Sequence, residues 1–357
     1  MVNPEPNFGE CSESSSEESC DTLPASQSSP SIFSAFDEEP HSSQPTGIPH
    51  LLDQGFIQMN ISTDALEDQL PYKLSRIVSL SGIIVSLIGV ILNFFSYQTT
   101  KHLKFQNSSV TLIRCQAIWE TASIVHDGFF ELGGSYANYP FKNINSYLCK
   151  VSFFSNWATT LAATYHMSLL AVDRIIAIKL PIWYKNNSKP SLAYKMSGCV
   201  VMLTFLASSP NLKKFQLSNS LCILGGSESF KFWYIRVYLA AFGFVIPFAI
   251  VFFSNIFFII SLRERSKENS FERRLTIMLI SNCTVFCIIT ASIVILAIYY
   301  FTAQTITAYD HAMFLLNENT QYLLGSLNFS VNFILYFVSG AVYRKAFISW
   351  CKQMINA

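Results

Sequence analysis

An acidic and a basic residue stand side by side at the end of a long apolar run, and a cysteine opens the same run. Asp173 and Arg174 follow Cys149 by 24 and 25 residues. At a rise of 1.5 Å per residue, a helix over this run would hold the cysteine and the arginine roughly 37 Å apart, on opposite faces of a membrane. An arginine beside an acid at a helix end is a contact for which a binding partner can compete. The spacing therefore predicts a membrane-spanning helix with a switchable charged contact at one end.

A carboxylate also lies inside a second apolar run, because Glu120 stands near the middle of residues 110–132. An ionisable group within a bilayer is costly, so it is a functional candidate by default. His126 and His166 stand in two different runs without the His-x-x-x-His spacing of a metal site, and no nucleophile, phosphate-loop or nucleic-acid motif is present. We therefore expect a protein that is not an enzyme, needs no cofactor and binds no nucleic acid.

The composition indicates a membrane protein. Of the 357 residues, 51% are hydrophobic and only 13% are charged, whereas soluble domains carry charge on about a quarter of their residues. A helix needs roughly 20 apolar residues to cross a bilayer, and seven runs reach that length: residues 77–100, 110–132, 148–178, 192–210, 233–262, 275–301 and 313–338. The expected fold class is an all-α membrane protein, a seven-transmembrane helix bundle.

The charges are distributed unevenly and orient this bundle. Residues 1–72 hold 13 acids and no Lys or Arg, and they are rich in Ser and Pro. Such a composition predicts a disordered tail ahead of a membrane domain over residues 73–342. Sixteen of the 24 basic residues would lie on the membrane face that carries Arg174. The excess of bases marks the inner face, so we expect the N-terminal tail outside the cell, where Asn60 of an Asn-Ile-Ser motif is a glycosylation acceptor.

This orientation places two cysteines outside, where disulfides form. Cys149 opens the third run, and Cys222 lies in the loop before the fifth. A bridge between them would tie the outer end of the third helix to that loop, and the alternative is two unrelated thiols.

With these features the chain resembles the rhodopsin-like G-protein-coupled receptors over residues 75–351. Asp173-Arg174-Ile175 resembles the family's Asp/Glu-Arg-Tyr motif, and residues 328–336 resemble its Asn…Asn-Pro-x-x-Tyr run, with Phe333 in the proline position. Residues 343–347 (YRKAF) resemble the amphipathic eighth helix on the inner membrane surface, so we expect residues 343–357 to form that helix, in contact with membrane lipid, and a short tail. Cys351 is then a candidate for palmitoylation, or a free thiol.

The resemblance implies roles for particular residues. The residues that would couple to a heterotrimeric G protein are Asp173, Arg174, Ile175, Asn332 and Tyr336, with the arginine held by its neighbouring acid in the inactive state. A polar cluster that binds sodium or a proton would comprise Asn93, Glu120, Asn328 and Asn332. Ala163 replaces a serine ligand of that cluster, so a protonated Glu120 that is hydrogen-bonded to asparagines is an equal alternative.

The sixth helix departs from the family pattern. In the register that places Phe286 at the family's core phenylalanine, Thr290 replaces a tryptophan and Ser292 replaces the proline of the kink. A helix without that proline lacks the usual hinge. We therefore expect either that Ser292 and neighbouring polar groups soften the helix or that activation differs.

Features of the predicted outer face restrict the ligand. Asn156 occupies the position of the acid in amine receptors, and residues 311–338 contain no retinal-linking lysine. The expected pocket is lined by Asn156, Trp157, Thr160, Arg236, Glu318, Gln321 and Tyr322. Outer acids would attract a basic ligand, so we expect a receptor for a short basic neuropeptide in the plasma membrane. The alternatives are a lipid or chemosensory ligand, or a seven-span transporter or channel, although no internal repeat supports the last.

Overall fold

The computed structural model describes only part of the chain. Two compact units are distinguished, residues 1–48 and 49–357, and every described residue belongs to the second: residues 66–103, 105–218, 221–225, 233, 234, 238, 241–264, 284–292, 295 and 307–356. Asn60 and Arg236 lie outside these ranges.

The first helix, α2, spans Leu70–Lys101 and has Pro71 in its first turn, where a missing N–H costs nothing. It begins seven residues before the predicted span, so the last residues of the predicted tail are helical. Its buried face is a stripe of small side chains, Ser75, Ser79, Gly82, Ser86, Gly89, Asn93 and Ser96. Small residues let helices approach closely, and here α2 packs along α12. A Cβ at Gly89 would overlap the hydroxyl of Ser330 on α12.

The second helical segment changes its winding along its length. The helix α3 (Ser108–Val125) is capped by Asn107, whose side chain accepts from the backbone N–H of Val110. It continues into a π-helical stretch, η1 (His126–Leu132), and then into the short α4 (Gly133–Tyr136). A π-helical stretch shifts the register of the side chains after it, and such stretches are frequent at functional sites.

The third helix lies at the centre of the bundle. The helix α5 (Ser146–Lys179) is capped by Asn145 and contacts α3, α7 and α10. It is followed by α6 (Pro181–Asn187), α7 (Pro190–Ser208) and α8 (Asn211–Lys214). Two short strands, β1 (Phe215–Ser218) and β2 (Leu221–Leu224), then pair antiparallel, with Leu217 opposite Cys222. The 3₁₀ turn η2 (Phe141–Asn143) precedes α5 and contacts β2.

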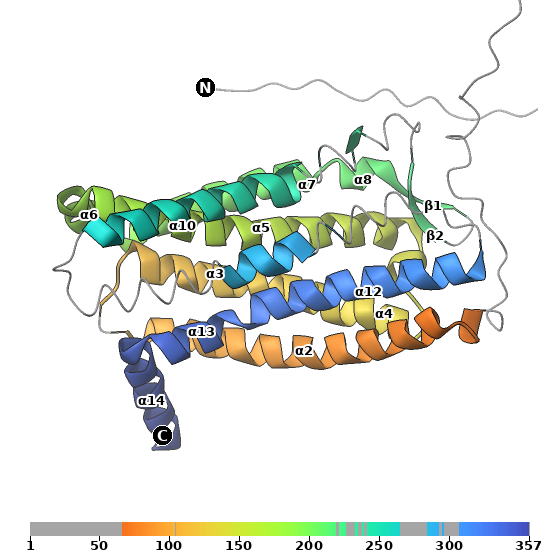
Figure 1. Cartoon of the computed structure of the whole chain (residues 1–357), viewed down its shortest axis with the longest axis horizontal. Helices are drawn as coiled ribbons and strands as arrows, with labels where there is room; N and C mark the ends of the chain where they lie inside the picture. The colour runs from red at the N-terminus through yellow and green to blue at the C-terminus, as the bar shows by residue number, and fades with distance from the viewer. Residues whose placement is uncertain are drawn as a thin grey trace, which may run out of the picture. The chain divides into compact units, whose positions relative to one another are not determined.

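The remaining elements complete the described part of the bundle. The π-helical η4 (Ala241–Val245) leads into α10 (Ile246–Glu264), and residues 284–292 are helical. The helix α12 (Ala308–Ser330) starts with a capping box between Thr307 and Asp310, and α13 (Asn332–Ser339) follows it. The last helix, α14 (Ala341–Ile355), makes an angle of 97° with the preceding span. Figure 1 shows it turning away from the other helices. This helix covers most of residues 343–357, where the sequence resemblance predicts an amphipathic eighth helix.

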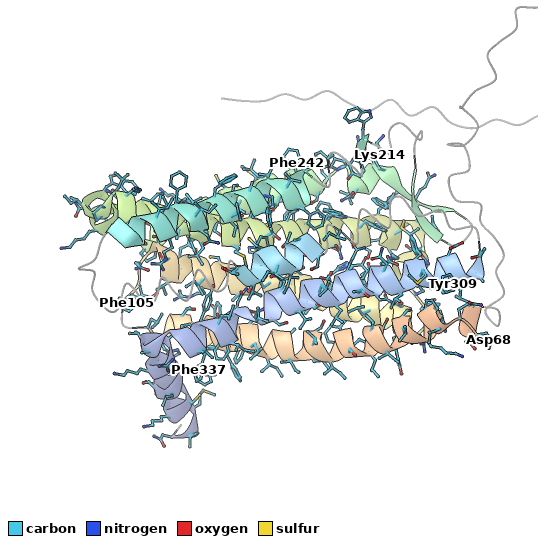
Figure 2. All side chains as sticks on the ribbon, in the orientation of Figure 1. Asp68, Phe105, Lys214, Phe242, Tyr309 and Phe337 are labelled. Atoms are coloured by element: carbon cyan, nitrogen blue, oxygen red, sulfur yellow. A yellow bond between two sulfur atoms is a disulfide. The ribbon has the colours of Figure 1, made fainter. Side chains whose placement is uncertain are left out.

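Two ends of the bundle can be distinguished. Figure 2 places Asp68 and Tyr309 at one end and Phe105 and Phe337 at the other. The strands β1 and β2 lie at the first, which we call the disulfide end, and α6 and α14 lie at the second, which we call the Arg174 end.

Several described helices match the predicted spans. Among the described residues, 70–101, 146–179 and 190–214 form helices long and apolar enough to cross a membrane, and residues 308–338 and 341–355 pass the same test as a bent pair. Residues 241–257 form a shorter apolar helix. The predicted second span coincides with α3 and η1, and most of the predicted sixth span lies outside the described residues.

We expect Gly89→Ala to destabilise the protein and Gly198→Ala not to do so. The added methyl at position 89 would force α2 away from Ser330, and such overpacking costs about 1–3 kcal/mol. A Cβ at Gly198, on α7, meets no atom within 4 Å, so this variant controls for helix propensity. The thermal unfolding midpoints of the two detergent-solubilised variants test this expectation. Labelling of buried Cys115 with a thiol-reactive dye reads out unfolding. Equal midpoints for the two variants would contradict the tight α2–α12 contact.

Candidate functional site

The predicted disulfide is present. Cys149, in the first turn of α5, is bonded to Cys222 on β2, and their Cα atoms are 5.5 Å apart. The hairpin is held by two further contacts: the backbone N–H of Cys222 donates to Oδ1 of Asn143 at 2.9 Å, and the rings of Phe153 and Phe215 stack with their centroids 3.7 Å apart. The bridge therefore fixes the strands to α5 and to the η2 turn.

A lysine of that turn joins two helices at the disulfide end. The Nζ atom of Lys142 lies 2.8 Å from Oε2 of Glu131 on η1 and 3.1 Å from Oε1 of Glu318 on α12. Burial alone would lower the pKa of Lys142, but the two carboxylates outweigh burial and raise the pKa above its ordinary value. Lys142 therefore remains an ammonium ion at neutral pH, and Glu318, a predicted ligand contact, already has a partner within the chain.

Hydrogen bonds continue from Glu131 across the second and third helices. Ser152 Oγ lies 3.3 Å from Oε1 of Glu131 and 3.4 Å from Nε2 of His126. Asn156 Nδ2 lies 3.0 Å from both Nδ1 of His126 and Oδ1 of Asp127. All of these side chains except that of Asn156 are at least nine-tenths buried. Asn156, the predicted ligand contact in the amine position, is thus part of an internal network with its own acid, Asp127.

The other predicted pocket residues contact neighbouring helices. Trp157 packs against Gly243 and edge-to-face against Phe244, so it joins α5 to η4. The hydroxyl of Thr160 lies 2.9 Å from that of Ser123 on α3. On α12, Gln321 donates to Asn317 at 3.3 Å, and Tyr322 interacts electrostatically with Glu131 and Lys142. The structure therefore brings Asn156, Glu318 and Tyr322 into one polar region, with Trp157 and Thr160 on the α5 wall.

The predicted polar cluster lies deeper in the bundle. Glu120 is 1% exposed and accepts from Nε2 of Gln116 at 2.6 Å and from Nδ2 of Asn332. Asn93 donates to the backbone carbonyl of Phe329 at 3.1 Å. The structure therefore joins Glu120 directly to Asn332, and Asn93 to the same helix, α12, that carries Asn328.

Four amide oxygens are buried acceptors without a hydrogen-bond partner in the described part of the chain. Three belong to this cluster, those of Asn93, Asn328 and Asn332, and the fourth is that of Gln116 beside it. A buried acceptor without a donor is costly and requires a water or an ion. These oxygens and the Glu120 carboxylate are hard donors that suit sodium, whereas two amide donors to Glu120 suit the alternative of a hydrogen-bonded acid. The donor set is therefore compatible with both predicted alternatives.

At the Arg174 end, Asp173 has partners other than its neighbour. Its carboxylate accepts from Ser108 Oγ at 2.7 Å, from Ser109 Oγ, and from the hydroxyl of Tyr184 on α6 at 3.0 Å. Within the described residues Arg174 forms no ion pair, and its Nε has no hydrogen-bond partner. In this structure three hydroxyls therefore satisfy the acid, and the Asp173–Arg174 pairing expected for the inactive state stays a prediction.

The rest of the predicted coupling motif lies beside Arg174 and on the seventh helix. Ile175 is half-buried on α5, and Tyr336 is 1% exposed and packs edge-to-face on Tyr343 of α14. Phe333, in the proline position, contacts the rings of Phe95, Phe337, Tyr343 and Phe347. Cys351 is a partly exposed free thiol on α14. An aromatic cluster thus holds the junction of α13, α14 and α2.

The described part of the sixth helix agrees with the register assigned from sequence. Phe286 is 2% exposed and packs with Met167, Ala171 and Val251, and Thr290 is also buried. The hydroxyl of Ser292 donates to the carbonyl of Ile288 at 3.1 Å. A serine that bonds back to the preceding turn often bends a helix, so this contact supports the softening expected at the kink position.

Sequence reasoning missed three contributors to the site. Asp127 follows Glu120 by seven residues, two helical turns, and this spacing could have placed it on the same face. Lys142 is the one base of residues 133–148, yet nothing in the sequence shows which acids it meets. The hydroxyls around Asp173 come from separate elements, and only the tertiary structure brings them together.

We expect Tyr184→Phe to lower the free energy of unfolding by about 1–3 kcal/mol, because a buried carboxylate loses a donor. Tyr147→Phe is the matched control, since Tyr147 is 73% exposed. Thermal or urea unfolding of the purified protein measures both variants. If the two tyrosine variants are equally stable, the contact with Asp173 contributes nothing.

Comparison with known proteins agrees with these features. The family described as 7 transmembrane receptor (rhodopsin family) matches residues 135–336. Chemerin-like receptor 1 of Mus musculus is 32% identical over 65 residues, which is 18% of both chains. The Homo sapiens protein of the same name is 31% identical over 65 residues, 18% of this chain and 17% of the relative. The match thus spans less than a fifth of the length of these relatives, whereas the family match covers more than half of this chain. The chain belongs to the rhodopsin family of seven-transmembrane receptors.

Proposed function

We propose that this receptor binds an extracellular ligand at the disulfide end and activates heterotrimeric G proteins at the Arg174 end. The observation that carries the proposal is the state of Arg174, which lacks an ion-pair partner in the described structure while its neighbouring acid is satisfied by hydroxyls. A cationic side chain that no described acid neutralises is available to a partner protein. The guanidinium offers five donors, which suit the carbonyls and carboxylates at a helix end.

Membership of the family makes the chain a multi-pass protein of the plasma membrane, and we propose that its N-terminal tail is extracellular. The excess of Lys and Arg on the face of Arg174 supports this orientation. The disulfide lies at the opposite end and would then face the oxidising side. Glycosylation of Asn60 and palmitoylation of Cys351 follow from the same orientation.

The two ends are connected through the polar cluster in the proposed mechanism. Glu120 on α3 is hydrogen-bonded to Asn332 at the start of α13, and Asn332 precedes Tyr336 by one helical turn. A movement of the seventh helix at the disulfide end would change these bonds and shift the equilibrium of helix arrangements around Arg174. Glu120 would hold sodium in one arrangement or a proton in another, with the asparagines as ligands or donors.

The acids at the disulfide end support a short basic peptide as the ligand. Among the described residues of this region, Glu131 and Glu318 share the one positive charge of Lys142. The excess of negative charge would attract a cationic ligand and raise its rate of association.

We expect cationic and amidated peptides to evoke a second-messenger response in cells that express the receptor. Calcium and cyclic AMP are measured together, beside a control receptor with a known peptide. A response to lipids or small chemosensory molecules alone would replace the peptide by the alternative ligand class. Current or uptake without any ligand would favour a transporter or channel instead.

We expect Arg174→Ala to abolish G-protein activation while leaving the amount of receptor at the cell surface unchanged. Binding of a non-hydrolysable GTP analogue to membranes measures activation, and labelling of an epitope on intact cells measures surface amount. Lys352→Ala is the control, because Lys352 is an exposed base at the same end of the bundle. Full activation by Arg174→Ala would remove Arg174 from the proposed mechanism.

A further inference from the structure

The ammonium group of Lys142 occupies a position that is built from three elements. Glu131 on η1 and Glu318 on α12 hold its nitrogen at 2.8 and 3.1 Å, and the ring of Phe153 on α5 lies with its centroid 5.5 Å from the same nitrogen. The side chains of Lys142 and Glu131 are only 15% and 7% exposed. Two carboxylates and an aromatic face are the groups that recognise an organic cation in proteins.

Among the described residues, the positive charge in this position is smaller than the negative charge around it. Glu131 and Glu318 face one ammonium ion, and Asp127 joins Glu131 through Asn156, His126 and Ser152. A protonated lysine therefore neutralises only part of the site. A second cation could exchange with it without leaving the carboxylates uncompensated.

The residues beside Lys142 show what its release would change. Phe141 contacts Phe130 with ring centroids 5.0 Å apart, and Asn143 accepts from the backbone N–H of Cys222. The three residues of η2 thus fasten the second helix, the seventh helix and the disulfide-bonded hairpin to one turn. Displacement of Lys142 would free the seventh helix from this turn while the disulfide keeps the hairpin in place.

We propose that Glu131 and Glu318 form a subsite for an ammonium or guanidinium group of the ligand, and that Lys142 is its resident occupant, which the ligand displaces. This inference rests on the proposed function, since it names the ligand group that the pocket of that receptor recognises. The sequence resemblance predicts Glu318 as a ligand contact but assigns it no partner. A cationic group of the ligand must compete with Lys142 for the two carboxylates. A ligand without such a group leaves Lys142 bound to them and η2 attached to α12.

A chemical-rescue experiment tests the subsite. Lys142→Ala removes the atoms of a propylammonium ion from between the two carboxylates. We expect the purified variant to have a lower thermal midpoint than the wild type, and millimolar n-propylammonium to restore it. Equimolar 1-propanol or sodium chloride should not restore it, because the first lacks the charge and the second lacks the shape. Lys213→Ala, which removes an exposed lysine at the same end, should keep the wild-type midpoint.

A second variant covers the case in which the alanine variant does not fold. Lys142→Gln keeps most of the side-chain length and removes the charge. We expect argininamide to raise the midpoint of this variant at a concentration on the order of tenfold lower than for the wild type, because no internal cation competes. Adding Glu318→Gln to Lys142→Gln should abolish the difference.

The outcomes separate the subsite from the proposed function. Equal responses of the wild type and Lys142→Gln to argininamide, or equal rescue by propanol and propylammonium, would overturn the subsite. These midpoints require no G protein. A protein that shows the cation effects but never activates a G protein would contradict the proposed function alone, and a receptor that signals through Arg174 without any cation effect would contradict the subsite alone.

Discussion

The arrangement of the helices depends on one constraint, which is that ionisable and amide side chains inside a bilayer need partners within the bundle. Glu120 meets it through Gln116 and Asn332, and Asp173 through the hydroxyls of Ser108, Ser109 and Tyr184. Most of these partners lie on a different element from the acid they bond. Each buried acid therefore fixes the rotation of its own helix and the position of a neighbouring one. The helix α3 carries Glu120 and also supplies the two serine hydroxyls that bind Asp173.

Close packing makes these bonds possible. The small residues along α2 let α12 approach until the hydroxyl oxygens of Ser86 and Ser326 are 3.1 Å apart. The side-chain amide of Asn319 donates to the hydroxyl oxygen of Ser75, also at 3.1 Å. A helix interface lined by larger side chains would separate the backbones and leave these polar groups unpaired. The same small residues therefore determine both the helix spacing and the position of the seventh helix, which comprises α12 and α13. This helix carries Glu318, Asn328 and Asn332.

Much of this could be predicted from sequence, because apolar length and charge distribution are local properties. The spans near α2, α5 and α7 and the Cys149–Cys222 bridge agree with predictions from run length and spacing. The partners of Asp173 and Lys142 could not be predicted, because they come from elements that only the folded chain brings together. The π-helical η1 could not be predicted either. A single extra residue in a turn leaves the apolar run unchanged, but it changes the direction of the side chains of Asp127 and Glu131.

The departures from the family pattern also have a physical account in the structure. Proline normally breaks the seventh helix by removing a hydrogen bond, but here Phe333 stands at that position and α12 still ends at Ser330, before α13 begins at Asn332. Asn332 bonds Glu120, and the Phe333 ring packs among aromatic side chains of α2, α13 and α14. Side-chain contacts on both sides therefore stabilise a break that no proline imposes here. In the proposed mechanism, a break maintained by packing and by one carboxylate would respond to the protonation or ion binding of Glu120, and the absence of the proline would make the seventh helix more dependent on that residue.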